Sequence, residues 1–209
     1  MATLPGHLDR ATVVRRGRWL SWLTLGYNSL EGIIAIGAGT MAGSIALVGF
    51  GFDSLIEVTA SIAALWRLSA DVNPVDRERA ERLTLRIVGI LFIALGIYVT
   101  WDAAQALLNR EGPEESRIGI ALAAVSLIVM PVLARAKRKI ATALESRALR
   151  SEAQQTQLCT YLSAILLGGL ALNALLGWWW ADPVAALIMV PIIAKEGVEA
   201  LRGHDACCE

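Results

Sequence analysis

The sequence predicts an all-α membrane protein with six transmembrane helices, both termini in the cytoplasm and no soluble domain. Of its 209 residues, 56% are hydrophobic, and the mean hydropathy is +0.54, which is high for a soluble domain. The charged residues gather in clusters between long apolar runs, the pattern of a multi-span membrane protein. The 19 basic and 19 acidic residues cancel, so the net charge by itself says nothing about nucleic acid; we expect no nucleic-acid partner.

Six apolar runs account for most of the chain. We place them at residues 19–40, 44–66, 83–107, 118–134, 156–176 and 183–200. A cytoplasmic N-terminal segment (1–18) and a short cytoplasmic tail (201–209) then flank the transmembrane domain (19–200), and no removable signal peptide is expected. The first two and the last two runs are joined by very short links, which requires antiparallel neighbours. The loops after the second and fourth runs are expected to be longer and charged.

Basic residues give the orientation, because cytoplasmic segments of membrane proteins are enriched in Lys and Arg. The segments assigned to the cytoplasm hold Arg10, Arg15, Arg16, Arg18, Arg67, Arg77, Arg79, Arg82, Arg86, Arg135, Lys137, Arg138, Lys139, Arg147, Arg150, Lys195 and Arg202. The opposite side holds only Arg110 and Arg117. Tryptophans agree, with Trp19, Trp22 and Trp66 at inner ends and Trp101 and residues 178–180 at outer ends. Both patterns require an even number of spans.

Two acidic residues, Asp53 and Glu57, interrupt the second apolar run, which is about 22 residues long and can cross a bilayer as a helix. Each carboxylate within such a span costs roughly 2.5–3.5 kcal/mol on the insertion scale. The i, i+4 spacing places both on one helix face, one turn apart, so they repel each other unless they share a proton or a cation. No basic residue within the predicted spans can neutralise both. The pair therefore predicts a cation site.

Glu31 is the third acidic residue within a span. Counted inward from the outer ends of the first two spans, Glu31 and Asp53 lie at the same depth, roughly 14 Å at 1.5 Å per residue. Asn28 and Glu57 match one turn further in. Adjacent helices thus present two polar pairs at equal heights. Glu31 is either a further ligand or a protonated acid that forms a hydrogen bond with a neighbouring helix.

Gln155 and Cys159 add a second i, i+4 pair at the start of the fifth span. A thiolate combined with carboxylates suits a borderline-soft divalent metal, Zn²⁺ first and Cd²⁺ by softness, although a lone buried cysteine is more often an ordinary apolar residue. Measured from the outer ends of their spans, Cys159 lies roughly 27 Å deep and Glu57 roughly 20 Å deep. Helix tilt or a different outer boundary must account for this difference if the two residues are neighbours. The tail residues His204, Cys207 and Cys208 are either a second metal site or a frayed terminus.

These residues resemble the transmembrane domain of the cation diffusion facilitator family of metal/proton antiporters. The second span is similar to the family's, in which a His or Asp is followed four residues later by an Asp, here Asp53 and Glu57. The run NPVDRERAE at residues 73–81 resembles the family's loop after that span. The family's fifth-span His-x-x-x-Asp falls on Gln155 and Cys159, and Gln155 is a poor metal ligand. The family's large C-terminal cytoplasmic domain has no counterpart in this sequence, so the chain resembles a short branch.

The resemblance implies a divalent metal exporter, Zn²⁺ first, that is driven by proton antiport with alternating access. It also implies a homodimer, which the transmembrane helices would hold together, and a location in the cell membrane, the cytoplasmic membrane of a bacterium. Beyond the transported metal and protons we expect no cofactor. A membrane metal receptor or scaffold that does not transport is the alternative. An enzyme is not expected, because the spans hold no His-rich metal motif and no nucleophile–base pair.

Overall fold

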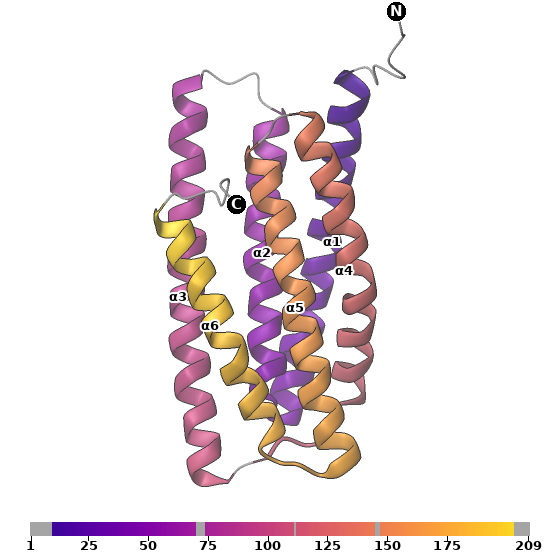
Figure 1. Cartoon of the computed structure of the whole chain (residues 1–209), viewed down its shortest axis with the longest axis vertical. Coiled ribbons are helices and arrows are strands. Elements are labelled where there is room, and N and C mark those ends of the chain that lie inside the picture. Colours follow the sequence, from indigo (N-terminus) through magenta and orange to yellow (C-terminus); the bar gives the residue numbers. More distant parts are fainter. Residues whose placement is uncertain (1–9, 70–73, 111, 145–146, 203–209) are drawn as a thin grey trace, which may run out of the picture.

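The structure, a computed structural model, describes residues 10–69, 74–110, 112–144 and 147–202. Over these ranges it contains six α-helices and no strand (Figure 1). The helices are α1 Arg10–Ala42, α2 Ile45–Ser69, α3 Pro74–Asn109, α4 Arg117–Ala143, α5 Arg147–Leu176 and α6 Ala181–Arg202. Each of the six predicted runs lies mainly within one helix. The predicted fold class is confirmed.

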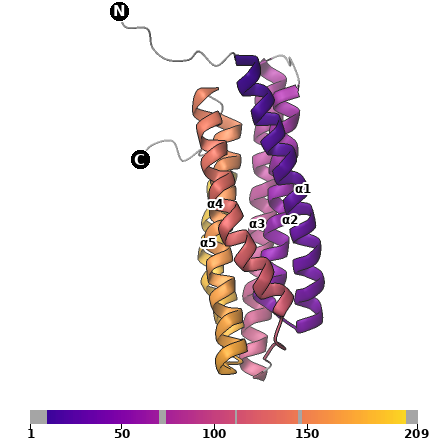
Figure 2. The same cartoon turned by 90° about the vertical axis from the view of Figure 1, so that its right-hand side faces the viewer.

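The helices form an elongated bundle. Helices α1, α2, α4 and α5 pack around one another, and α3 and α6 pack together along the side of α2 (Figures 1 and 2). Helix α2 is central, because it contacts α1, α3, α5 and α6. The start of α1 and the end of α6 lie at the same end of the bundle (Figure 1). This agrees with the even number of crossings that the charge pattern predicts.

The outside of the bundle is apolar, and the buried polar side chains face inward among a larger hydrophobic core, because lipid cannot hydrogen bond to side chains. Helix α1 shows this clearly. Its large exposed side chains include Trp19, Trp22, Leu30 and Ile33, whereas its buried polar residues are Ser21, Thr24, Asn28 and Glu31. Four described segments are long and apolar enough to cross a membrane: Ile45–Ala63, Leu85–Asn109, Arg117–Ala143 and Glu152–Leu176. The chain is therefore a multi-pass membrane protein.

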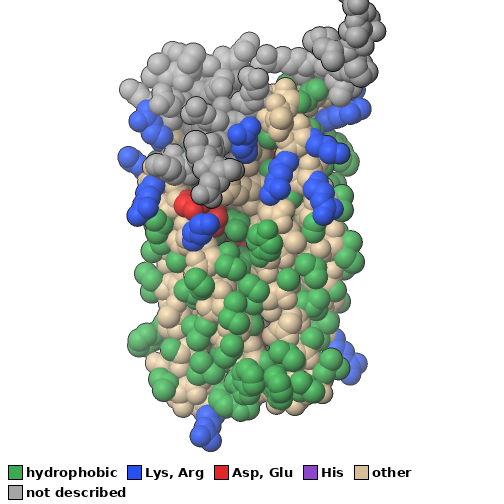
Figure 3. Space-filling model, in the orientation of Figure 1, with side chains coloured by type: hydrophobic (Ala, Val, Ile, Leu, Met, Phe, Trp, Pro, Cys, Tyr) green, Lys and Arg blue, Asp and Glu red, His purple; other side chains and the backbone are tan. Residues whose placement is uncertain are grey.

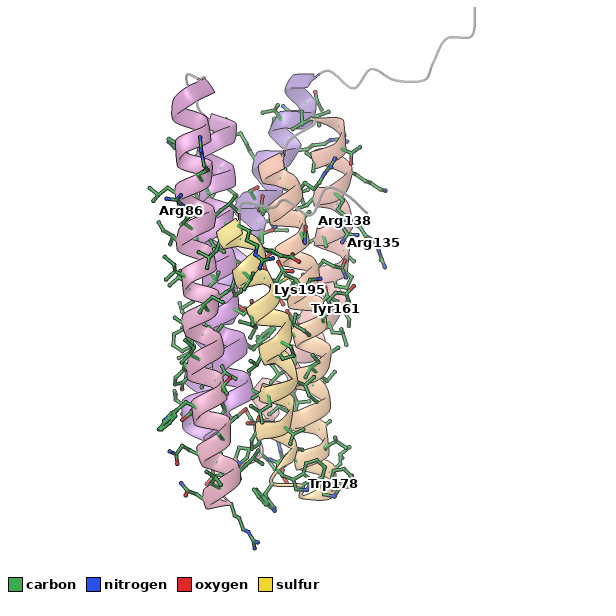
Figure 4. All side chains as sticks on the ribbon, turned by 60° about the vertical axis from the view of Figure 1, so that its left-hand side comes forward. Arg86, Arg135, Arg138, Tyr161, Trp178 and Lys195 are labelled. Atoms are coloured by element: carbon green, nitrogen blue, oxygen red, sulfur yellow. The ribbon has the colours of Figure 1, made fainter. Side chains whose placement is uncertain are left out.

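Charged residues gather at one end of the bundle. On the face shown in Figure 3, most Lys and Arg side chains lie at the end where α1 begins, and hydrophobic side chains cover the remainder. Figure 4 shows Arg86, Arg135 and Arg138 in that half and Trp178 at the opposite end. The loops predicted after the second and fourth spans are largely helical instead, because α3 begins at Pro74 and α4 continues to Ala143. Arg, Lys, Glu and Ala favour helix in water, so the helices extend beyond the apolar runs.

Glycine lets α1 and α2 approach closely. A Cβ atom on Gly51 would lie 2.7 Å from Cγ1 and 2.9 Å from the backbone nitrogen of Ile36. On the other helix, a Cβ on Gly32 would lie 3.1 Å from the Gly51 carbonyl oxygen. This close contact keeps the polar face of α1 against the two acidic residues of α2.

Gly43 and Gly177 occupy the short turns with φ of 66° and 64°, values that favour glycine.

Candidate metal site

Asp53 and Glu57 are both buried inside the bundle. The exposed fractions are 5% for Asp53 and 3% for Glu57. They are buried because α2 is enclosed by neighbouring helices along the face that carries them. Each carboxyl is close enough to the other for their charges to interact. The structure thus keeps the predicted pair together on one face, away from lipid.

Glu31 lies beside this pair and connects four helices. Its Oε2 accepts a hydrogen bond from Ser54 of α2 at 2.9 Å, and its Oε1 accepts one from Ser126 of α4. The Cys159 sulfur of α5 is 4.0 Å from Glu31 Oε2. The charge of Glu31 also interacts with that of Asp53. The depth matching of α1 against α2 therefore placed Glu31 correctly, while Ser54 and Ser126 were not predicted.

Cys159 joins the acidic group despite the depth mismatch calculated from the sequence. Its free thiol is fully buried and lies within electrostatic range of Glu31, Asp53 and Glu57. The mismatch arose from the outer boundary. In Figure 1 the outer end of α5 extends beyond that of α2, and the chain then returns so that Asp182 of α6 meets Ser44. Counting inward from Gly177 therefore overestimated the depth of Cys159.

Several buried polar atoms of the predicted ligands and their neighbours in the sequence have no hydrogen-bond partner among the described residues. They are the Tyr27 hydroxyl oxygen, both amide atoms of Asn28, Oε2 of Glu57 and Oε1 of Gln155. Asn28 is fully buried and lies near Glu57, which agrees with the equal depths calculated from the sequence. Buried polar groups in proteins are normally satisfied. Oxygen atoms of the kind that bind metals are thus available next to three carboxyls and a thiol.

The described side chains do not yet form a closed coordination shell. No three of the His, Cys, Asp and Glu residues that the structure describes converge closely enough to hold a metal ion. The four predicted ligands with strong donors (Glu31, Asp53, Glu57 and Cys159) are nevertheless neighbours, on α1, α2 and α5. The predicted tail residues His204, Cys207 and Cys208 lie outside the described residues.

A buried ion pair next to Glu57 was not predicted. Lys137 of α4 lies 2.9 Å from Oε1 of Glu152 and 3.6 Å from Oε1 of Glu57. It was assigned to a cytoplasmic loop, yet it is only 1% exposed. Lys137 lies beyond the predicted fourth span and pairs with Glu57 but, among the described contacts, not with Asp53, so it provides a partner for one acid of the pair that the sequence analysis did not foresee. The spacing of the buried residues of α4 (Ser126, Met130, Leu133, Lys137 and Ala141) could have revealed this, because it continues one helical stripe.

Glu152, near the start of α5, anchors one side of this group. Its Oε2 accepts a hydrogen bond from Ser21 of α1 at 3.0 Å, and its Oε1 accepts one from Ser61 of α2 at 3.1 Å. One turn further along α5, the Thr156 hydroxyl donates to Glu57 Oε1 and accepts from Lys137 at 2.8 Å. This group links α1, α2, α4 and α5. A chain of polar contacts thus leads from Glu152 to the acids at the centre of the bundle.

Asp182 is the other acidic residue that the sequence analysis missed. It is fully buried at the outer end and accepts hydrogen bonds from the Ser44 hydroxyl at 2.5 Å and from the backbone N–H of Ile45 at 2.9 Å. These contacts satisfy the free donors at the start of α2. Nothing in the local sequence connects Asp182 with a helix that begins more than a hundred residues earlier.

Comparison with known proteins assigns the fold to a family. Residues 21–203 match the family described as the cation efflux transmembrane domain. An uncharacterized transporter of Synechocystis sp. is 26% identical over 175 residues, covering 81% of this chain and 56% of that protein. The cation-efflux pump FieF of Serratia proteamaculans is 27% identical over 182 residues (83% and 59%), and Transmembrane protein 163 of Xenopus laevis is 25% identical over 188 residues (90% and 66%).

The chain spans less than two thirds of the length of these relatives. The matched region nevertheless includes the residues of the candidate site from Asn28 to Cys159, together with α2, α4, α5 and most of α1. The buried acids on α1 and α2, the thiol on α5 and the six-helix bundle lie within one continuous match. The protein belongs to the cation efflux family of membrane proteins.

Proposed function

We propose that this protein exports a divalent transition metal, Zn²⁺ first and Cd²⁺ as the alternative cargo, in exchange for protons. The observation that supports this most strongly is the grouping of three buried carboxyls and a thiol, with the unpartnered Asn28 amide oxygen and Glu57 Oε2 among them. Oxygen and thiolate donors together suit borderline-soft cations. The name of one relative, the cation-efflux pump FieF of Serratia proteamaculans, agrees with this direction of transport.

Proton exchange follows from the chemistry of the ligands. Carboxylates and thiols bind a metal only after they lose their protons, so metal and protons compete for Asp53, Glu57 and Cys159. Loading from one side therefore releases protons, and protons arriving from the other side displace the metal. We propose that the helices alternate the access to this site between the two sides.

The location and assembly are part of the same proposal. We propose that the protein acts in the cytoplasmic membrane of a bacterium, with the charged end of the bundle in the cytoplasm. We propose a homodimer held by the transmembrane helices, and mass measurement of the purified protein in detergent tests it. A mass of one chain would exclude the dimer.

Transport into proteoliposomes tests the function. When Zn²⁺ is added outside vesicles that have a more acidic interior, we expect Zn²⁺ uptake in exchange for protons. This uptake should stop when a protonophore collapses the proton gradient. Asp53→Asn should abolish the flux, whereas Asp102→Asn, at the exposed hydrogen bond to Tyr98, should not. Undiminished flux in Asp53→Asn would overturn the site. Stoichiometric Zn²⁺ binding without any flux would show a receptor instead of a transporter.

A further inference from the structure

Lys137 is the one basic side chain that is buried in the part of the chain that the structure describes. Its ammonium nitrogen lies between two carboxylates, 2.9 Å from Glu152 Oε1 and 3.6 Å from Glu57 Oε1. It also donates a hydrogen bond to Thr156 at 2.8 Å. A buried charge is tolerated only when it is paired, and here two partners compete for one cation.

The two partners differ in how completely they are satisfied. Both oxygens of Glu152 accept hydrogen bonds, Oε2 from Ser21 and Oε1 from Ser61 and Lys137. In Glu57, by contrast, Oε1 faces Thr156 and Lys137, whereas Oε2 is buried without a partner. Glu152 is therefore equipped to hold Lys137 alone. Glu57 has one oxygen occupied and one free to bind another cation.

We propose that Lys137 is a tethered counter-cation of the metal site, which neutralises Glu57 in the metal-free protein and withdraws to Glu152 when a divalent cation binds. The inference rests on the proposed function. Lys137 is thus a positioning residue, since it acts on the metal through Glu57 and does not bind the metal itself. Its effect is to weaken metal binding and to speed release, because the ammonium returns to Glu57 as the metal leaves.

Electrostatics gives the sign of the effect. A divalent ion and an ammonium ion on the same carboxylate repel each other strongly at distances of a few ångströms in a protein interior. A metal ion on Oε2 of Glu57 therefore drives Lys137 away from Oε1, and part of the binding free energy is lost in doing so. Glu152 limits that loss, because the displaced ammonium keeps a partner with which it already forms its shorter contact.

The test is metal affinity of the purified full chain, measured by competition with a chromophoric Zn²⁺ chelator. Lys137→Met removes the competing charge, so we expect Zn²⁺ to bind at least about tenfold more tightly. In transport, the same variant should have a lower KM and a lower kcat. Glu152→Gln leaves Lys137 with Glu57 as its only carboxylate partner, so binding should weaken. The double variant Lys137→Met/Glu152→Gln should have the same Zn²⁺ affinity as Lys137→Met, because it has no ammonium group for Glu152 to hold.

The control is Lys195→Met, which breaks an exposed ion pair with Glu199 at 3.7 Å and should leave the affinity unchanged. Unchanged or weaker Zn²⁺ binding in Lys137→Met would overturn the proposal. Weaker binding is the result expected if Lys137 only supports the structure of the site, and unchanged binding is expected if it does not compete with the metal. If Lys137→Met does not fold, the double variant decides, since removing both charges of a buried pair is often well tolerated. Its affinity must exceed that of the parent. Asp53→Asn distinguishes the role of Lys137 from the proposed function. Normal metal binding in that variant would show that the metal does not bind at the acidic pair at all.

Discussion

Asp182, the second residue of α6, accepts a 2.5 Å hydrogen bond from the hydroxyl of Ser44, the residue that precedes α2. Its other carboxylate oxygen accepts from the backbone N–H groups of Ile45 at 2.9 Å and Ala46 at 3.3 Å. The Ser44 oxygen in turn accepts from the N–H of Leu47 at 3.1 Å. A side chain from the last helix therefore caps the helix that carries the acidic pair, and it fixes where α2 begins.

Removing this cap should destabilise the protein. Asp182→Ala leaves the Ser44 hydroxyl and two backbone N–H groups without their acceptor, at an expected cost of about 2–4 kcal/mol. Thermal unfolding in detergent measures the loss. Asp102→Ala, which removes only an exposed 3.2 Å hydrogen bond from Tyr98, is the matched control. Equal stability of the two variants would show that the cap contributes little.

A second prediction concerns Gly51, where α1 packs closely on α2 and a larger side chain should lower the stability. Gly51→Ala introduces a Cβ atom 2.7 Å from Ile36 Cγ1 and 2.9 Å from its backbone nitrogen, so the helices must separate, at a cost of about 1–3 kcal/mol. Gly168→Ala is the control, because a Cβ there meets nothing within 4 Å. Differential thermal unfolding should show a loss only for Gly51→Ala. Metal affinity should fall as well, since Glu31 moves away from α2.

Glu31 is expected to bind the metal. Glu31→Gln keeps an oxygen that can accept from Ser54 or Ser126, so the fold should be retained while a charged ligand is lost. Zn²⁺ affinity should fall by about tenfold or more, since even an outer partner of a metal ligand is worth that much. Glu199→Gln, at the exposed pair with Lys195, is the control. An affinity equal to that of the parent would remove Glu31 from the ligands.

Cys159 should determine the preference among metals. Cys159→Ser replaces a soft sulfur donor with a hard oxygen of similar size, so Cd²⁺ binding should weaken more than Zn²⁺ binding. The comparison is made in a Cys207→Ser/Cys208→Ser background, so that the tail thiols do not bind either metal. Competition titrations with both ions give the ratio of affinities. A ratio that does not change on removal of Cys159 would show that the thiol only fills space.

The sequence was sufficient for features that depend on hydropathy and helical spacing. The six helices follow from the apolar runs, and the acidic pair lies on one face of α2 because its members are four residues apart. The alignment of Asn28 and Glu31 with that pair follows from a rise of about 1.5 Å per residue in antiparallel neighbours. These are local properties of one helix or of two helices joined by a short turn. They need no knowledge of the other four helices.

Only the tertiary structure decided the environment of Lys137, Glu152 and Asp182. A lysine among arginines at the end of a span has the same local pattern whether it faces water or the bundle, and packing of α4 against α5 buries it next to Glu152. The depth of Cys159 likewise depended on how far α5 extends beyond α2, which local spacing does not give. The sequence determined which residues lie on each helix face, and packing determined which faces meet, because contacts between distant helices depend on the whole bundle.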